Sequence, residues 1–226
     1  MTELATTPIQ ADPEVGRPSR THWRVAGGLT LAHVVLLFAA FSQEVAVTHG
    51  TSLADLQDKY GSADMTRVFA GGYIEATSFL VLVPALVLLA RLFGRRTEAG
   101  RVAAQSFLAL GVAYVGATLA IGFAPGAAAI YAAHHGVPIA TIAMVNDIRN
   151  YAFYLGVAMS CAMMLTLGIA ALTERVFVKW VGWCGVVLGA IGIVVTPFAQ
   201  NAISMVWVVW IVGLGVLALR GGPAED

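Results

Sequence analysis

Charged side chains are scarce in this sequence. Asp, Glu, Lys and Arg make up 12% of its 226 residues, whereas hydrophobic residues make up 58%. A soluble domain carries about 25% charged residues, because its water-facing surface needs them. With a mean hydropathy of +0.79, most of the chain is predicted to face lipid. Acidic and basic residues balance at 13 each, so the net charge gives no indication of a nucleic-acid partner.

Cysteine and the familiar catalytic motifs are also missing or rare. The two cysteines, Cys161 and Cys184, lie in apolar runs and form no CxxC or CxxCH pattern, which excludes a zinc ribbon, a redox pair and a c-type haem attachment. His33 is the only histidine inside a predicted membrane helix, so a haem held by two histidines lacks its second ligand. No cofactor is predicted. The absence of a P-loop or a GxSxG elbow disfavours a familiar membrane enzyme, without excluding an unfamiliar one.

Long apolar runs are the main positive feature. Six of them approach or exceed the ~20 residues that a helix needs to cross ~30 Å of hydrocarbon. They cover residues 25–45, 68–92, 102–123, 151–172, 176–198 and 202–219. The predicted fold is all-α, a polytopic bundle of six transmembrane helices in one domain at 21–220. A flexible tail is expected at 1–20 and a short tail at 221–226.

The lysines and arginines predict the orientation of these helices. Ten of the thirteen would lie on one side of a six-helix bundle, and three on the other. The majority are Arg17, Arg20, Arg24, Arg91, Arg95, Arg96, Arg101, Arg175, Lys179 and Arg220; the minority are Lys59, Arg67 and Arg149. Because positive residues gather on the cytoplasmic side, we expect a multi-pass protein of the cell membrane with both termini in the cytoplasm.

Two outer loops and one glycine-rich helix carry further local signals. Residues 52–57 read as a short amphipathic helix capped by Ser52, and the alanine-rich part of the loop at 124–145 is predicted to form a re-entrant or interfacial helix. Glycines recur at intervals of three and four in the fifth run, at Gly182, Gly185, Gly189 and Gly192. Small residues on one face let two helices approach closely. This face is expected to meet another helix of the chain, a second copy or a partner membrane protein.

Polar side chains concentrate near the predicted outer surface. A charge inside a membrane helix costs at least ~2.5–3.5 kcal/mol, so it needs a reason. The candidate ligand-binding residues are Glu44, Glu75, Asn146, Asp147, Arg149, Asn150 and Tyr154. Arg149 is the expected ion-pair partner of Glu75. The spacing of Asn146, Arg149 and Asn150 puts them on one helical face. A purely structural salt bridge remains the alternative interpretation.

A metal site is a further, less favoured alternative. His134 and His135 lie in the outer loop, where Glu44 or Asp147 would complete the ligand set. Adjacent histidines do not share a helix face, however, and neither HxxxH nor HExxH is present.

The layout of the chain resembles a family of six-helix bacterial membrane proteins of actinobacterial type, the domain-of-unknown-function 4386 proteins. The similar features are residues 24–28 (RVAGG) at the start of the first run, the long outer loop at 46–66 with its acidic Asp55, Asp58 and Asp64, and residues 179–183 (KWVGW) at the start of the fifth run. The resemblance implies the six-helix layout and carries over no functional residues.

Three functions fit these observations. The favoured one is binding or transport of a small solute through an outward-facing polar pocket. The same cluster would also suit a membrane-embedded enzyme or metal protein. In the third, the chain is an accessory subunit of a membrane complex, and its outer cluster is structural. The bilayer itself is the one partner that all three share.

Overall fold

The computed structural model describes residues 19–45, 47–48, 50–177 and 179–222. The predicted tail at 1–20 therefore lies almost wholly outside the described residues. The fold is all-α. In chain order the elements are α1 (Arg20–Phe41), α2 (Leu53–Gly61), α3 (Met65–Phe93), α4 (Glu98–Ala117), the π-helix η1 (Thr118–Phe123), α5 (Ala124–His134), α6 (Ile139–Glu174) and α7 (Lys179–Leu219).

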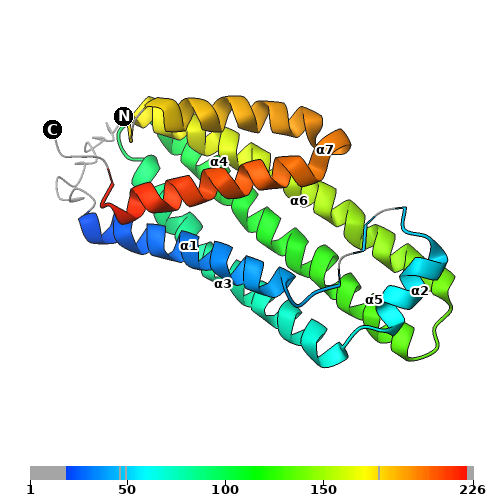
Figure 1. The fold of residues 1–226 in the computed structure, drawn as a ribbon. Coiled ribbons are helices and arrows are strands. Elements are labelled where there is room, and N and C mark those ends of the chain that lie inside the picture. The colour runs from blue at the N-terminus through cyan, green and yellow to red at the C-terminus, as the bar shows by residue number, and fades with distance from the viewer. Residues whose placement is uncertain (1–18, 46, 49, 178, 223–226) are drawn as a thin grey trace, which may run out of the picture.

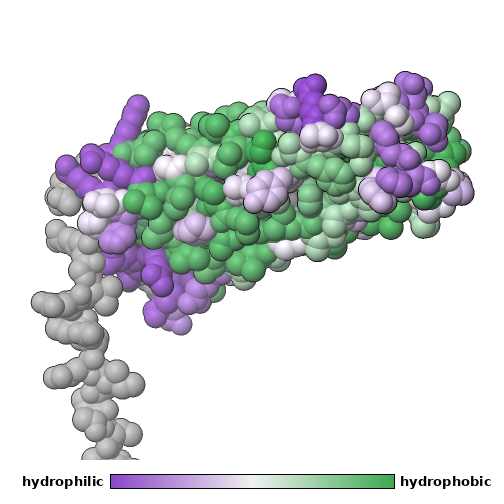
Figure 2. Space-filling view, turned by 90° about the horizontal axis from the view of Figure 1, so that it is seen from below, coloured by the Kyte–Doolittle hydropathy of each residue, from purple (hydrophilic) through white to green (hydrophobic). Residues whose placement is uncertain are grey.

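Five helical stretches in the described part of the chain are long and apolar enough to cross a membrane. They are α1, α3, the continuous stretch Glu98–His134, α6 and α7. Their side chains form a hydrophobic core from α1, α3, α4, α6 and α7. The face shown in Figure 2 carries a broad hydrophobic belt, with hydrophilic residues gathered mostly toward the two ends of the molecule. This is the surface that a lipid bilayer requires, so the prediction of a helical membrane protein is confirmed.

The last helix is bent back on itself. Ala199 has non-helical backbone angles (φ −145°, ψ 40°), and Pro197 lies two residues before it. Proline lacks the N–H that would bond the preceding turn, which breaks the helix here. Figure 1 shows the two halves of α7 lying side by side, with the second half returning to the end of the bundle where α1 begins. The two predicted runs at 176–198 and 202–219 correspond to these halves.

The glycine face of α7 packs against α6 of the same chain. A Cβ added to Gly189 would lie 2.6 Å from the Cys161 carbonyl oxygen, and one added to Gly185 would lie 2.8 Å from the Met164 carbonyl oxygen. The predicted close approach of two helices is thus confirmed. Because α6 covers this face, it leaves no room there for a second copy or a partner helix, and that part of the prediction is wrong.

The outer part of the bundle differs from the prediction. The residues at 124–134 do not form a re-entrant helix, because α5 continues directly from α4 through the π-turn of η1. Likewise α6 begins at Ile139, twelve residues before the predicted run at 151. These outer segments pack on each other and on α2 around Tyr60, Ile130 and Ile142. A hydropathy pattern alone does not detect such packing.

The short helix α2 was predicted correctly. It spans Leu53–Gly61, and the Ser52 hydroxyl accepts a hydrogen bond from the Asp55 amide (3.1 Å). Such a cap satisfies an N–H that the helix itself leaves unpaired. The helix matters for the site because it carries Tyr60 to the outer polar cluster.

At the other end of the bundle, where α6 ends and α4 begins, one buried carboxylate joins two segments by hydrogen bonds. Glu174, at the end of α6, accepts hydrogen bonds from the backbone amides of Arg95, Arg96 and Thr97 and from the Thr97 hydroxyl. These groups precede α4, so an anion at this position also complements the dipole of that helix. Gly100 leaves the space that the carboxylate occupies. The clamp joins the α3–α4 turn to the end of α6.

Candidate functional site

A cavity of about 540 Å³ lies in the part of the bundle away from the end where α1 begins and α7 ends. Its wall is built from the last turns of α1 and the chain after it, from α3, from α4 and η1, from the middle of α6 and from the second half of α7. A volume of this size is typical of sites that hold a small molecule. Its charged and amide side chains are Glu44, Glu75, Arg149, Asn150, Gln200 and Asn201.

Helical rise places this cavity near one edge of the apolar belt. Glu75 lies 18 residues from Phe93, the last residue of α3, which corresponds to about 27 Å along a helix. Ala199, at the bend in α7, lies 20 residues from Lys179, or about 30 Å. Both positions thus fall near the far edge of a hydrocarbon layer ~30 Å thick. The few charged and amide side chains of an otherwise largely apolar wall therefore lie toward this edge of the apolar belt.

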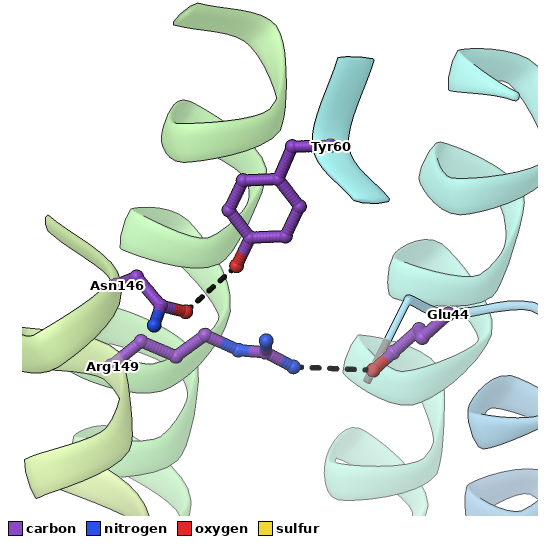
Figure 3. A network of polar contacts seen from close by, with 4 residues as sticks. All are labelled: Glu44, Tyr60, Asn146 and Arg149. Carbon is purple, nitrogen blue, oxygen red and sulfur yellow. Dashed lines mark hydrogen bonds and ion pairs between the residues drawn. The ribbon is translucent and has the colours of Figure 1, made fainter. Parts of the chain in front are cut away.

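Arg149 is the central cation of the site. It is carried by α6, and its side chain passes over Gly126 of α5, where an added Cβ would lie 3.0 Å from its Cδ and Nε atoms. Its guanidinium nitrogen Nη2 lies 3.6 Å from Oε2 of Glu44, and Figure 3 shows the side chain reaching across toward that carboxylate. The ion pair is partly screened from water, with side-chain exposures of 27% for Arg149 and 14% for Glu44.

This pairing corrects the prediction for Glu75. Within the described residues, the ion pair of Arg149 is with Glu44, whereas the Glu75 carboxyl group lies within hydrogen-bonding reach of the Glu44 carboxyl group. Glu75 and Arg149 do line the same cavity, so their proximity and inward orientation are confirmed. Glu44 follows the end of α1, and nothing in the local sequence indicated that its loop reaches α6.

The glycines before Glu75 explain how these groups come together. A Cβ on Gly71 would lie 2.8 Å from Cβ of Gln43, and one on Gly72 would overlap the ring of Phe123. The two glycines therefore let the end of α1 and the π-turn approach α3 closely. The π-turn itself contributes Thr118 and Gly122 to the cavity wall. Such local widenings of a helix occur frequently at functional sites.

Asn146 has a partner that the sequence did not indicate. The Tyr60 hydroxyl donates a hydrogen bond of 2.7 Å to Oδ1 of Asn146, and both residues are buried. Burial raises the pKa of Tyr60, which keeps the hydroxyl protonated as a donor. Figure 3 shows this bond next to the Glu44–Arg149 pair. Asn146 is not part of the cavity wall, and its role in ligand binding stays a prediction.

Two polar atoms at the cavity are buried without a hydrogen-bond partner among the described residues. They are Oε1 of Glu44 and Nδ2 of Asn150. Nearly all buried polar groups in proteins are bonded, so each exception needs an explanation such as a proton, a water molecule or a ligand. One acceptor and one donor are therefore available at the same site.

The remaining predicted residues divide between cavity and surface. Tyr154 lines the cavity, as predicted. Asp147 lies on the exposed side of α6 and is not part of the wall. The backbone of α6 explains this separation, because adjacent residues on a helix point in directions about 100° apart.

The predicted histidine metal site gains no support. His134 and His135 are exposed, and Nδ1 of His135 lies 2.7 Å from the carbonyl oxygen of Tyr131. The described residues contain no group of three His, Cys, Asp or Glu side chains placed to hold a metal ion.

Comparison with known proteins gives no family for this chain. No protein-family model matches the sequence, and no curated protein or solved structure is significantly similar to it. The resemblance to the domain-of-unknown-function 4386 proteins therefore stays a prediction.

Proposed function

We propose that the chain is a six-pass protein of the cell membrane, with both termini in the cytoplasm, that binds or transports a small solute through its outer cavity. The observation that carries this proposal is the coincidence of the 540 Å³ cavity with the Glu44–Arg149 pair and Glu75. A purely structural ion pair would be expected to lie in packed surroundings, because an adjoining void removes contacts and weakens the bundle.

Two features support the six crossings. The bend at Ala199 divides α7 into halves of about 20 residues, each the length of one crossing. In Figure 1, α1 begins and α7 ends at the same end of the bundle, and this arrangement supports an even number of passes. The Glu174 clamp and its neighbours Arg95, Arg96 and Arg175 lie at that end, and the positive-inside rule assigns such an end to the cytoplasm.

A reporter experiment tests this topology. A reporter that is active only in the cytoplasm should be active when fused after Asp226, and one fused after Gly136, between α5 and α6, should be inactive. The reverse pattern would invert the orientation and turn the cavity toward the cytoplasm.

A ligand screen tests the function. Purified protein in detergent would be heated with members of a solute panel that covers organic cations, carboxylates, amino acids and sugars. A ligand that binds only the folded state at 100 times its Kd adds about 2.7 kcal/mol of stability. At least one class should raise the melting temperature of the wild type.

Two matched variants of α7 locate the binding. Ser204→Trp fills part of the cavity and should abolish the shift, whereas Val209→Trp alters a residue that is 72% exposed on the same helix and should retain it. If no class shifts the wild type, or if the shift survives in Ser204→Trp, the cavity is not a solute site.

A further inference from the structure

The wall of the cavity carries one negative charge in excess. Among the described residues that line it, the charged ones are Glu44, Glu75 and Arg149. Two carboxylates against one guanidinium leave a charge of −1 when all three are ionised. The cavity lies among apolar helices, where an uncompensated charge is strongly disfavoured. A positive charge, either a proton or a bound cation, must therefore neutralise the excess negative charge of the carboxylates.

A proton is the simplest compensation when the cavity holds no ligand. The Glu44 and Glu75 carboxyl groups lie within hydrogen-bonding reach of each other. Carboxyl groups this close in such surroundings share a proton, because both cannot remain ionised side by side. Oε1 of Glu44 has no hydrogen-bond partner among the described residues, so this carboxyl group has an oxygen available for a proton. Arg149 is already engaged with the other oxygen of Glu44.

The rest of the wall indicates which cation would replace that proton. Six aromatic side chains line the cavity: Phe41, Phe79, Tyr114, Phe153, Tyr154 and Trp207. Aromatic faces attract organic cations. A Ca²⁺ ion would instead need six to eight oxygen ligands, and a divalent charge exceeds the single negative charge available. The wall therefore suits a monovalent organic cation.

We infer that the cavity binds a small aromatic or alkyl ammonium ion in exchange for a proton shared by Glu44 and Glu75. The inference rests on the proposed function and names the solute class. The exchange conserves charge: the proton leaves its carboxyl oxygen for bulk water, and the cation takes its place between the carboxylates. In a membrane, this competition would couple uptake of a proton to release of the cation.

Other titratable groups lie near Glu75 on the elements that surround it. Arg149 of α6 and Tyr114 of α4 share the cavity with it. His33 of α1 lies one turn deeper, with its Nδ1 atom 3.0 Å from the Ser78 carbonyl oxygen. The second half of α7 contributes amides and no titratable side chain to the described wall. The carboxyl pair is thus the group whose proton lies where a cation would bind.

Calorimetric titration with benzyltrimethylammonium tests the exchange. The purified protein would be titrated in detergent at several pH values and in buffers of different ionisation enthalpy. We expect close to one proton to be released per cation bound. Where the pair is protonated, the affinity should rise about tenfold per pH unit, since proton and cation compete for one site.

Variants at two acidic residues separate this outcome from nonspecific attraction. Glu75→Gln keeps the shape of the protonated side chain and leaves the cavity neutral, so it should lower the affinity at least tenfold and abolish proton release. Asp58→Asn removes an exposed carboxylate from α2 and should change neither. Cation binding without proton release, or unchanged binding in Glu75→Gln, would overturn the inference.

Titration with benzenesulfonate and benzyl alcohol distinguishes failure of the inference from failure of the proposed function. One outcome is that benzenesulfonate or benzyl alcohol binds the wild type and not Ser204→Trp, whereas the cation does not bind. In that case the cavity remains a solute site and the cation assignment is wrong. If none of the three binds and the solute panel also gives no shift, both proposals fail.

Discussion

The packing of α6 against α7 leads to a sharp prediction for two glycines of the same helix. At Gly189, an added Cβ would lie 2.6 Å from the Cys161 carbonyl oxygen and 2.6 Å from the Leu165 backbone nitrogen. Both are backbone atoms of a helix, so neither moves without the whole segment. At Gly213, an added Cβ meets nothing within 4 Å.

Alanine at either position gives the same gain in helix propensity, about 1 kcal/mol. Overpacking at a tight contact costs about 1–3 kcal/mol. The propensity gain cancels when the two variants are compared, so Gly189→Ala should be about 1–3 kcal/mol less stable than Gly213→Ala. Gly189→Leu should be less stable still, because its longer side chain must force the helices apart.

Reversible unfolding in mixed micelles of a mild detergent and dodecyl sulfate measures this difference. Helix content and tryptophan fluorescence would be followed together, so that loss of packing is distinguished from loss of helix. Equal stability of Gly189→Ala and Gly213→Ala would mean that α6 and α7 do not meet backbone to backbone at Gly189.

Three further predictions concern polar contacts. In a double-mutant cycle on Glu44→Gln and Arg149→Met, we expect a coupling free energy of about 1–3 kcal/mol, between the values for exposed and fully buried pairs; additive effects would show that the pair contributes nothing. Tyr60→Phe leaves Oδ1 of Asn146 without its donor and should cost about 1–3 kcal/mol of unfolding free energy, with an unchanged midpoint as the contrary result. Glu174→Gln loses hydrogen bonds made by a charged acceptor, each worth about 1.5–3 kcal/mol, and should expose the α3–α4 turn to faster amide exchange; unchanged exchange would mean that the clamp does not hold the turn.

The transmembrane architecture was predictable because its cause is local. A long apolar run in lipid must satisfy its backbone hydrogen bonds within itself and therefore forms a helix, so the main helices follow from hydropathy alone. The glycine spacing in α7 likewise predicted a close helix contact, since Gly185 and Gly189 must share a face. The bend at Ala199 matches the gap between two predicted runs.

The details of the outer site were less predictable because they depend on contacts between distant segments. Glu75 and Arg149 were predicted to lie together from the cost of burying each alone, and they do line one cavity. The actual partner, Glu44, is brought to Arg149 by the path of the chain after α1. The bond from Tyr60 to Asn146 joins residues 86 positions apart, and no periodic pattern encodes it.

Hydrogen bonds to backbone groups were also not predictable from the sequence. The contacts of Glu174 did not follow from residue types, because three of its hydrogen bonds come from main-chain amides before α4. Every residue except proline carries such an amide, so the residue types in that turn do not distinguish it. The start of α6 at Ile139 was missed for a related reason, since its outer turns are stabilised by α5 rather than by lipid.

A structure of the protein in lipid nanodiscs, at a resolution that shows ordered water, would show directly whether the cavity holds a solute. We predict density for a compact non-lipid molecule in the cavity when the protein is saturated with its best-binding solute. That density should lie within 4 Å of the Glu75 carboxylate, which is the distance of an ion pair. It should also contact the aromatic side chains of the wall. An acyl chain in the cavity, or side chains collapsed to fill it with the same solute present, would contradict the claim that this cavity is a solute site.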